Sequence, residues 1–120
     1  MSDPAIDLPD LLERIQDNYP LLLAILAAFQ DVVISKRGIL REIIRTRCET
    51  GIKELIHLIK GSAGNISAMP VFNTCKLIEN DADRGYLVAL EENFSLLDRQ
   101  FNELEEYIAQ ILSDPKNQFR

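Results

Sequence analysis

A histidine and a lysine three residues apart are the side chains in this sequence best placed to do chemistry. His57 is the only histidine among the 120 residues. An imidazole nitrogen can act as a nucleophile. Lys60, at i+3, lies on the same side of a helix and supplies a cation that can reach a phosphoryl group on the ring. The pair is therefore the first candidate for a functional site.

Two glycines follow the histidine on a face that should be exposed. At about 100° per residue from Ile52, the apolar residues of this helix fall within about 60° and form a core stripe, namely Leu55, Ile56, Ile59, Ala63 and Ile66. His57 falls at about 140°, on the side that also holds Lys53, Lys60, Gly61, Gly64 and Ala68. Each glycine forgoes about 0.8–1 kcal/mol of helix propensity relative to alanine. Bare backbone beside an imidazole lets another macromolecule approach closely.

Two other interpretations apply to the same residues. A lone exposed histidine is often an incidental surface residue. A glycine pair can also serve close packing between helices, but the core stripe on the opposite face already accounts for packing. We therefore expect Gly61 and Gly64 to keep the surface open.

The elements that must position these residues are helices. Apolar residues recur at spacings of three and four, and no segment alternates with period two. Two stripes carry most of the expected core: in the second helix Leu22, Ile25, Leu26, Phe29, Val32, Val33, Ile39, Leu40, Ile43 and Ile44, and in the last Leu87, Leu90, Phe94, Leu97, Phe101, Leu104, Ile108 and Ile111. We expect an all-α fold, an antiparallel four-helix bundle with a short additional N-terminal helix.

Polar, glycine and proline residues mark the expected helix ends. Asp7 or Asp10 can cap the short first helix, which runs to about Asp17, and Asn18 with Pro20 begins the second. The second helix contains Gly38 as a weak point, and the joint at Thr50 and Gly51 precedes a third helix that ends near Ile66. A fourth helix restarts at 68–70 and stops at Gly85. We expect one domain over 1–120, with an ordered core of about 7–113 and a polar C-terminal tail that frays after Asp114-Pro115.

Composition excludes several classes of protein. Apolar residues make up 47% and charged residues 27%, and the net charge is −6, so the chain lacks the basic surface that nucleic acid binding needs. Cys48 and Cys75 sit among apolar residues and are expected to be buried free thiols, as in a reducing compartment. The N-terminal residues predict no signal peptide, because they lack a basic region followed by an apolar one, and the apolar run 21–29 is too short to span a bilayer. We expect a cytoplasmic protein with no nucleotide loop, no metal site and no membrane contact.

Residues 57–68 read His-Leu-Ile-Lys-Gly-Ser-Ala-Gly-Asn-Ile-Ser-Ala. This segment closely resembles the signature of histidine-containing phosphotransfer (HPt) domains, His-x-x-Lys-Gly-Ser followed by a small residue and Gly-Ala. The resemblance covers nearly the whole chain and includes Phe29, the stretch 75–79 and the end near Arg84-Gly85. Ser67 departs from it, because the family commonly has glycine there, which bears on where the third helix ends.

The resemblance implies a role for each matching residue. His57 would accept the phosphoryl group through Nε2, Lys60 would lie beside the phosphoryl oxygens, and Gly61 and Gly64 would leave the site open to a receiver domain. Glu79, on the next helix, would hydrogen-bond the other ring nitrogen and fix the tautomer. The chain would be a stoichiometric carrier without kinase activity or cofactor, and the partner would supply the aspartate and the Mg²⁺ site.

We therefore expect a monomer that carries phosphoryl groups between aspartates of receiver domains in a multistep phosphorelay, those of a hybrid sensor histidine kinase and of response regulators. The residues expected to dock the partner are Lys53, Gly61, Gly64, Ala68, Leu12 and Leu21, with Ile6, Leu8 and the rest of 21–24 as further contributors. The alternatives are a helical bundle that docks response regulators without carrying phosphate, and a purely structural helical domain. Met1 and the complete helix set favour a free-standing protein over the terminal module of a hybrid kinase.

Overall fold

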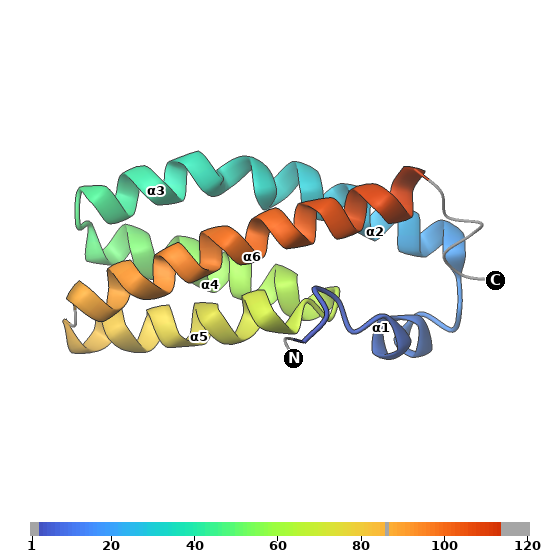
Figure 1. Ribbon diagram of the computed structural model, residues 1–120, viewed down its shortest axis with the longest axis horizontal. Helices are drawn as coiled ribbons and strands as arrows, with labels where there is room; N and C mark the ends of the chain where they lie inside the picture. The colour runs from blue at the N-terminus through green and yellow to red at the C-terminus, as the bar shows by residue number, and fades with distance from the viewer. Residues whose placement is uncertain (1–2, 86, 114–120) are drawn as a thin grey trace.

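Helices running side by side make up the molecule (Figure 1). The structure is a computed structural model that describes residues 3–85 and 87–113, without the side chains of Ile34 and Leu87. Its elements in chain order are α1 (Leu8–Arg14), α2 (Tyr19–Val32), the 3₁₀ turn η1 (Ile34–Lys36), α3 (Arg37–Arg45), α4 (Glu49–Asn65), α5 (Met69–Arg84) and α6 (Leu87–Ser113). These described ranges contain no strand, so the all-α prediction is confirmed.

Four helical columns form the bundle, and α1 lies at one end of it. In Figure 1, α2 and α3 follow one another in a line along the top, while α4, α5 and α6 run alongside them. α5 packs against both α4 and α6. The α6 stripe is buried as predicted at Leu90, Leu97, Phe101, Leu104, Ile108 and Ile111. The predicted tail after Ser113 lies outside the described residues.

Most helix ends lie where the capping residues place them. The Asp7 side chain accepts a hydrogen bond from the Asp10 amide at 3.2 Å, and that of Asn18 accepts one from Leu21 at 3.0 Å, each satisfying an amide that the helix leaves free. Gly85 ends α5 with a left-handed φ of 70°, as predicted. α1 ends at Arg14 instead of Asp17, because Gln16 and Asp17 take left-handed φ angles of 54° and 57°.

The predicted long second helix is interrupted, but not at Gly38. The break is η1, which follows the β-branched pair Val32-Val33, and the Ser35 hydroxyl donates to the Asp31 carbonyl. β-branched side chains lower helix propensity, and a serine that bonds the preceding turn bends a helix. Val32 and Ile39, expected in the core, lie on the surface on either side of this break, 49% and 53% exposed.

The corner between α3 and α4 corrects two further expectations. α4 begins at Glu49, so Gly51 lies in its first turn; a Cβ there would meet Ile43 Cγ2 at 3.1 Å, and the glycine lets α3 approach. Cys48 is the N-cap residue of α4 and is exposed. The prediction that it is buried was wrong because a capping residue belongs to no helical stripe, whereas Cys75 in α5 is buried as expected.

Ser67 ties α1 to the end of α4. Its hydroxyl donates to Asp10 at 2.6 Å and accepts from Arg14 at 2.5 Å, while Arg14 also bonds the carbonyls of Gly64 and Asn65. The backbone at Ser67 has a φ of 56°, a conformation that glycine adopts at lower cost. The departure from the family's glycine is thus accompanied by hydrogen bonds that glycine could not make.

Arg37 fastens α3 to α6. Its side chain is only 13% exposed, and its guanidinium lies over the Phe101 ring at 5.4 Å and pairs with Asp98 at 2.7 Å and Glu105 at 2.8 Å. Arg41, one turn later and 54% exposed, also pairs with Asp98. The ion pairs hold α3 against α6 immediately after the η1 break.

Tyr19–Arg45 is the one stretch among the described residues with the length and apolar composition to cross a membrane, at a mean hydropathy of 1.5. The core helix of a soluble protein passes the same test. In the fold, η1 divides this stretch into α2 and α3. The apolar composition of Tyr19–Arg45 is therefore only weak evidence for a membrane-spanning helix.

Candidate functional site

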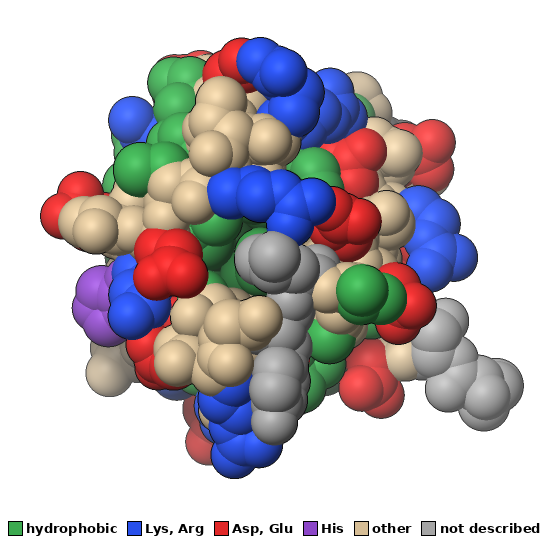
Figure 2. Space-filling model, turned by 90° about the vertical axis from the view of Figure 1, so that its left-hand side faces the viewer, with side chains coloured by type: hydrophobic (Ala, Val, Ile, Leu, Met, Phe, Trp, Pro, Cys, Tyr) green, Lys and Arg blue, Asp and Glu red, His purple; other side chains and the backbone are tan. Residues whose placement is uncertain are grey.

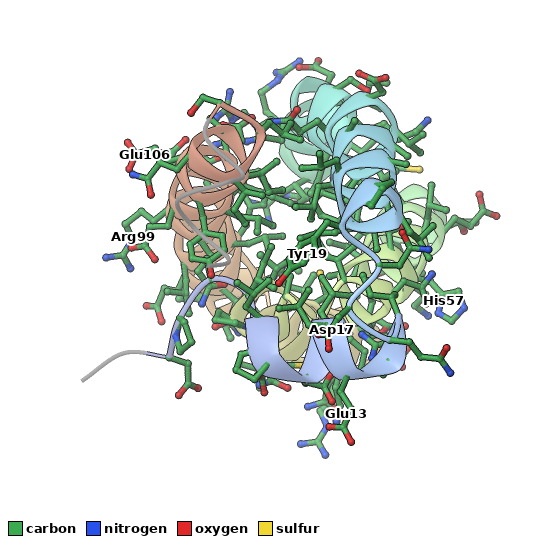
Figure 3. All side chains as sticks on the ribbon, turned by 90° about the vertical axis from the view of Figure 1, so that its right-hand side faces the viewer. Glu13, Asp17, Tyr19, His57, Arg99 and Glu106 are labelled. Atoms are coloured by element: carbon green, nitrogen blue, oxygen red, sulfur yellow. The ribbon has the colours of Figure 1, made fainter. Side chains whose placement is uncertain are left out.

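His57 stands on the outer side of α4, at the seam with α5. Its side chain is 75% exposed, because the core stripe Ile52, Ile56, Ile59 and Ala63 faces the opposite way and is buried. Figure 3 shows His57 pointing to solvent on the side of the bundle opposite Arg99 and Glu106. The ring is therefore accessible to a large partner.

Glu79 of α5 faces both His57 and Lys60. One carboxylate oxygen lies 3.5 Å from His57 Nδ1, and the other lies 2.7 Å from Lys60 Nζ. The first distance is longer than an ordinary hydrogen bond, so Glu79 lies beside the ring without a close bond to it. Nε2 makes no hydrogen bond to any residue that the structure describes.

Lys60 is not free in this arrangement. It is 24% exposed and Glu79 is 26% exposed, so both chains lie partly inside the α4–α5 seam. Their ion pair holds the ammonium about one helical turn from His57. An anionic group on the imidazole would compete with Glu79 for this ammonium.

A second ion pair joins the two helices on the other side of the histidine. Lys53 Nζ lies 2.8 Å from Asp83, and this hydrogen bond raises the pKa of Lys53. Two cross-helix pairs thus flank His57, one turn before it and one turn after it. Figure 2 shows the histidine at the surface in a neighbourhood of basic and acidic side chains.

Cys75 lies inside α5 one turn before Glu79. It is fully buried, and burial raises the pKa of its thiol to about 12. A thiol with so high a pKa is a poor nucleophile near neutral pH. Cys75 is therefore not suited to act as a nucleophile in this site near neutral pH.

The two glycines do different things. A Cβ at Gly61 would meet no atom within 4 Å, whereas a Cβ at Gly64 would lie 3.3 Å from the Phe72 ring. Gly61 is bare and exposed, as predicted. For Gly64 the expectation was wrong: it permits close packing of α5 on α4, on the flank of α4 rather than on its core stripe.

Alanine substitutions should separate these two roles. Gly61→Ala should raise the free energy of unfolding by about 0.8 kcal/mol, because it gains helix propensity with no contact to disturb. Gly64→Ala should gain clearly less, because Phe72 must move. Urea denaturation of both variants checks this order, and an equal gain at Gly64 would contradict the packing role.

Several predicted docking residues are placed elsewhere. Ala68 and Ile6 are fully buried, because Ala68 caps α5 beneath α1 and Ile6 enters the core just before α1. Leu12 is half-buried, and Leu8 likewise. Leu21 is 41% exposed, and Lys53 is exposed but paired with Asp83.

The structure shows an exposed apolar groove that the sequence reading assigned to the core. It lies between α2 and α4, holds about 270 Å³ and is lined by Ile25, Ala28, Phe29, Val32, Val33, Ser62, Asn65 and Ile66. Leu58, next to His57 in the chain, is 44% exposed. The sequence of α2 could have indicated this groove, because its apolar residues cover a wider arc of the helix than one buried stripe requires.

Comparisons with known proteins bear on the whole chain. The model of the Hpt domain family matches residues 5–114. Neither the curated proteins nor the solved structures give a significant match. Among the described residues no three His, Cys, Asp or Glu side chains gather as metal ligands.

Proposed function

Because the chain belongs to the Hpt domain family, with a phosphotransfer role in two-component signalling, we propose that His57 carries a phosphoryl group between receiver-domain aspartates in a multistep phosphorelay. The observation that carries the proposal is the exposed imidazole, whose Nδ1 faces Glu79 while Nε2 is open to solvent. The open Gly61 beside it leaves space for a partner.

The transfer step is a displacement at phosphorus. The lone pair of Nε2 attacks the phosphorus of the partner's aspartyl phosphate, a nitrogen–phosphorus bond forms, and the oxygen–phosphorus bond breaks with its electron pair returning to the aspartate. The neutral imidazole keeps its proton on Nδ1, so the ring becomes a phosphoimidazolium. The reverse step regenerates the imidazole when a second aspartate attacks.

Glu79 and Lys60 complement the charges that this step creates. A carboxylate beside Nδ1 favours the tautomer with the proton there, and it stabilises the positive ring that forms. Lys60 can turn from Glu79 toward the phosphoryl oxygens, as a flexible point charge does. The two residues exchange partners as the phosphoryl group arrives, since the phosphate takes the lysine and the ring takes the carboxylate.

The receiver domain would dock across the groove between α2 and α4. Val32 lines this groove and is exposed, and Leu21 and Leu58 are further exposed apolar side chains on the same two helices. An exposed apolar area next to a reactive group is typical of a protein-binding surface. We place the partner's aspartate above His57, with Gly61 directly under the contact.

The remaining features of the proposed carrier follow from its chemistry. Positioning and charge stabilisation around a metal ion supply most catalysis of phosphoryl transfer, and we expect the Mg²⁺ to be held by the receiver. We further propose a monomeric cytoplasmic protein without kinase activity of its own, and without nucleic acid or membrane binding. The hybrid kinase and the response regulators are its expected partners.

Transfer of a labelled phosphoryl group from a phosphorylated receiver domain tests the proposal. We expect acid-labile, alkali-stable label on the chain, as an N-phosphorylated histidine gives. Phosphoramidate serves as a second donor that needs no docking. If neither donor labels the chain, the carrier proposal fails; binding of receivers in that case would support a docking bundle.

Replacing the lysine should slow transfer without unfolding the protein. Lys60→Ala removes one charge-assisted contact to the phosphoryl oxygens, so the transfer rate should fall about 10- to 100-fold. The loss of a partly exposed ion pair should cost at most about 1 kcal/mol of stability. Rapid-quench transfer assays measure the rate.

Lys53→Ala is the matched control, since Lys53 is also paired across the seam one turn from His57. It should slow transfer less than about threefold. An equal effect of both variants would mean that general positive charge matters and not a contact from Lys60, and an unchanged rate in Lys60→Ala would remove its role.

A further inference from the structure

An exposed apolar strip runs beside the histidine on two helices. We call the docking strip Leu21, Ile25, Ala28 and Val32 of α2 with Leu58 and Ser62 of α4. On α2 these residues recur at spacings of four, three and four, so they share one flank. Ile25, Ala28 and Val32 face Ser62 across the groove, which makes the strip continuous between the helices.

Acidic side chains lie beside this strip on both of its helices and just before α2. We call the acidic rim Asp17, Asp31 and Glu54, which are all exposed. Glu54 lies one turn before Leu58 on α4, and Asp31 adjoins Val32 on α2. Asp17 precedes Leu21 by four residues, at the end of the bundle that faces the viewer in Figure 3.

The rim charges are not neutralised by the chain itself. Within the described ranges none of the three carboxylates forms an ion pair, whereas the basic residues nearest the site are paired, Lys53 with Asp83, Lys60 with Glu79 and Arg14 with Asp10. Lys36, four residues after Val32, forms no ion pair there, and Lys76 lies over the Phe72 ring beyond the seam. Three unpaired carboxylates against one unpaired lysine leave the margin of the strip net acidic, in keeping with the net charge of −6.

Resting on the proposed function, we propose that the acidic rim selects receiver domains whose docking surface is an apolar patch surrounded by lysine and arginine. Charges at the margin of an interface change the association rate and its salt dependence, and like charges brought together suppress wrong partners. The apolar strip supplies contact, while the rim steers a basic partner so that its aspartate approaches His57. Receivers with acidic margins are repelled.

Charge reversal at the rim tests this selection. The variant Asp31→Lys/Glu54→Lys and the control Glu103→Lys/Glu106→Lys each add four positive units, so both carry −2 in place of −6. The control residues are exposed on α6, and Figure 3 shows Glu106 on the side opposite His57. Association with two receiver domains, one with a basic and one with an acidic margin around its aspartate, is followed by stopped flow.

At about 0.05 M salt, the rim variant should associate with the basic receiver about tenfold more slowly than wild type does. The association rate of the control variant should stay within about twofold of the wild-type rate. The difference should disappear at about 0.5 M salt, where charges are screened. The acidic receiver should associate faster with the rim variant than with wild type. Equal rates for rim and control variants, or no preference between receivers, would overturn the inference.

Labelling by phosphoramidate separates this inference from the proposed function. All three proteins should accept the phosphoryl group equally from this small donor, because it needs no docking surface. If the proteins are labelled but charge reversal leaves the association rates unchanged, only the proposed role of the acidic rim is overturned. If neither donor labels the wild-type chain, the carrier role itself is overturned.

Discussion

Replacement of His57 by glutamine should abolish phosphoryl acceptance and leave the fold intact. Glutamine has no nucleophilic ring nitrogen, so labelling from a receiver or from phosphoramidate should fall by at least about a thousandfold, as loss of a nucleophile does. The side chain is 75% exposed and outside the core, so the free energy of unfolding should change by no more than about 0.5 kcal/mol.

Glu103→Gln on α6 is the matched control, because it places the same new side chain at an exposed position away from the site. It should accept label as wild type does. Label that persists in His57→Gln would assign the acceptor to another residue. A variant that is unlabelled and also unfolded, judged by circular dichroism, would be replaced by His57→Asn for the same measurement.

The placement of His57, Lys60 and Glu79 could be predicted from the sequence because they lie on only two helices, α4 and α5. The exposure of His57 follows from the buried stripe of α4 alone. The ion pairs of Lys53 with Asp83 and of Lys60 with Glu79 together show that α4 and α5 are antiparallel neighbours, as predicted. The roles of these residues in phosphoryl transfer stay predictions. Which side of a single helix is buried and which is exposed could be calculated from residue spacing alone, without knowledge of the other helices.

The surface for the partner could not be predicted in the same way, because it depends on which flank of each helix a neighbour covers. Val32 and Ala68 show both errors. Val32 looked like core by spacing but is exposed beside η1, and Ala68 looked exposed by spacing but is buried under α1. A helical wheel for one segment assumes that the helix continues and that nothing lies over its outer side.

Side-chain hydrogen bonding also decided features that apolar periodicity does not report. Ser35 bonds the preceding turn where the second helix breaks, and Ser67 holds α1 through Asp10 and Arg14. Both serines act through contacts that neither spacing nor hydropathy expresses. Gly64 is similar, since the aromatic ring that requires it belongs to the next helix.

Arg37→Ala should be the most destabilising of the surface-charge substitutions, by about 3 kcal/mol. It removes the cation over Phe101 and leaves Asp98 and Glu105 without their shared partner at a site where Arg37 is 13% exposed. Urea denaturation measures the loss. Arg41→Ala removes another partner of Asp98 from a 54% exposed position and should cost less than about 1 kcal/mol.

The dependence of this loss on pH identifies its cause. Burial raises the pKa of Asp98, but the hydrogen bonds from Arg37 and Arg41 together lower it by more than burial raises it. The pKa of Asp98 therefore lies below its ordinary value of 3.8. A carboxyl whose pKa is lowered by folding contributes stability above its ordinary value and loses it as the pH falls through the lowered one. The stability gap between wild type and Arg37→Ala should therefore narrow below pH 3.8. A gap that stays constant would assign the loss to packing over Phe101, and Arg37→Met, which keeps that packing, would then be as stable as wild type.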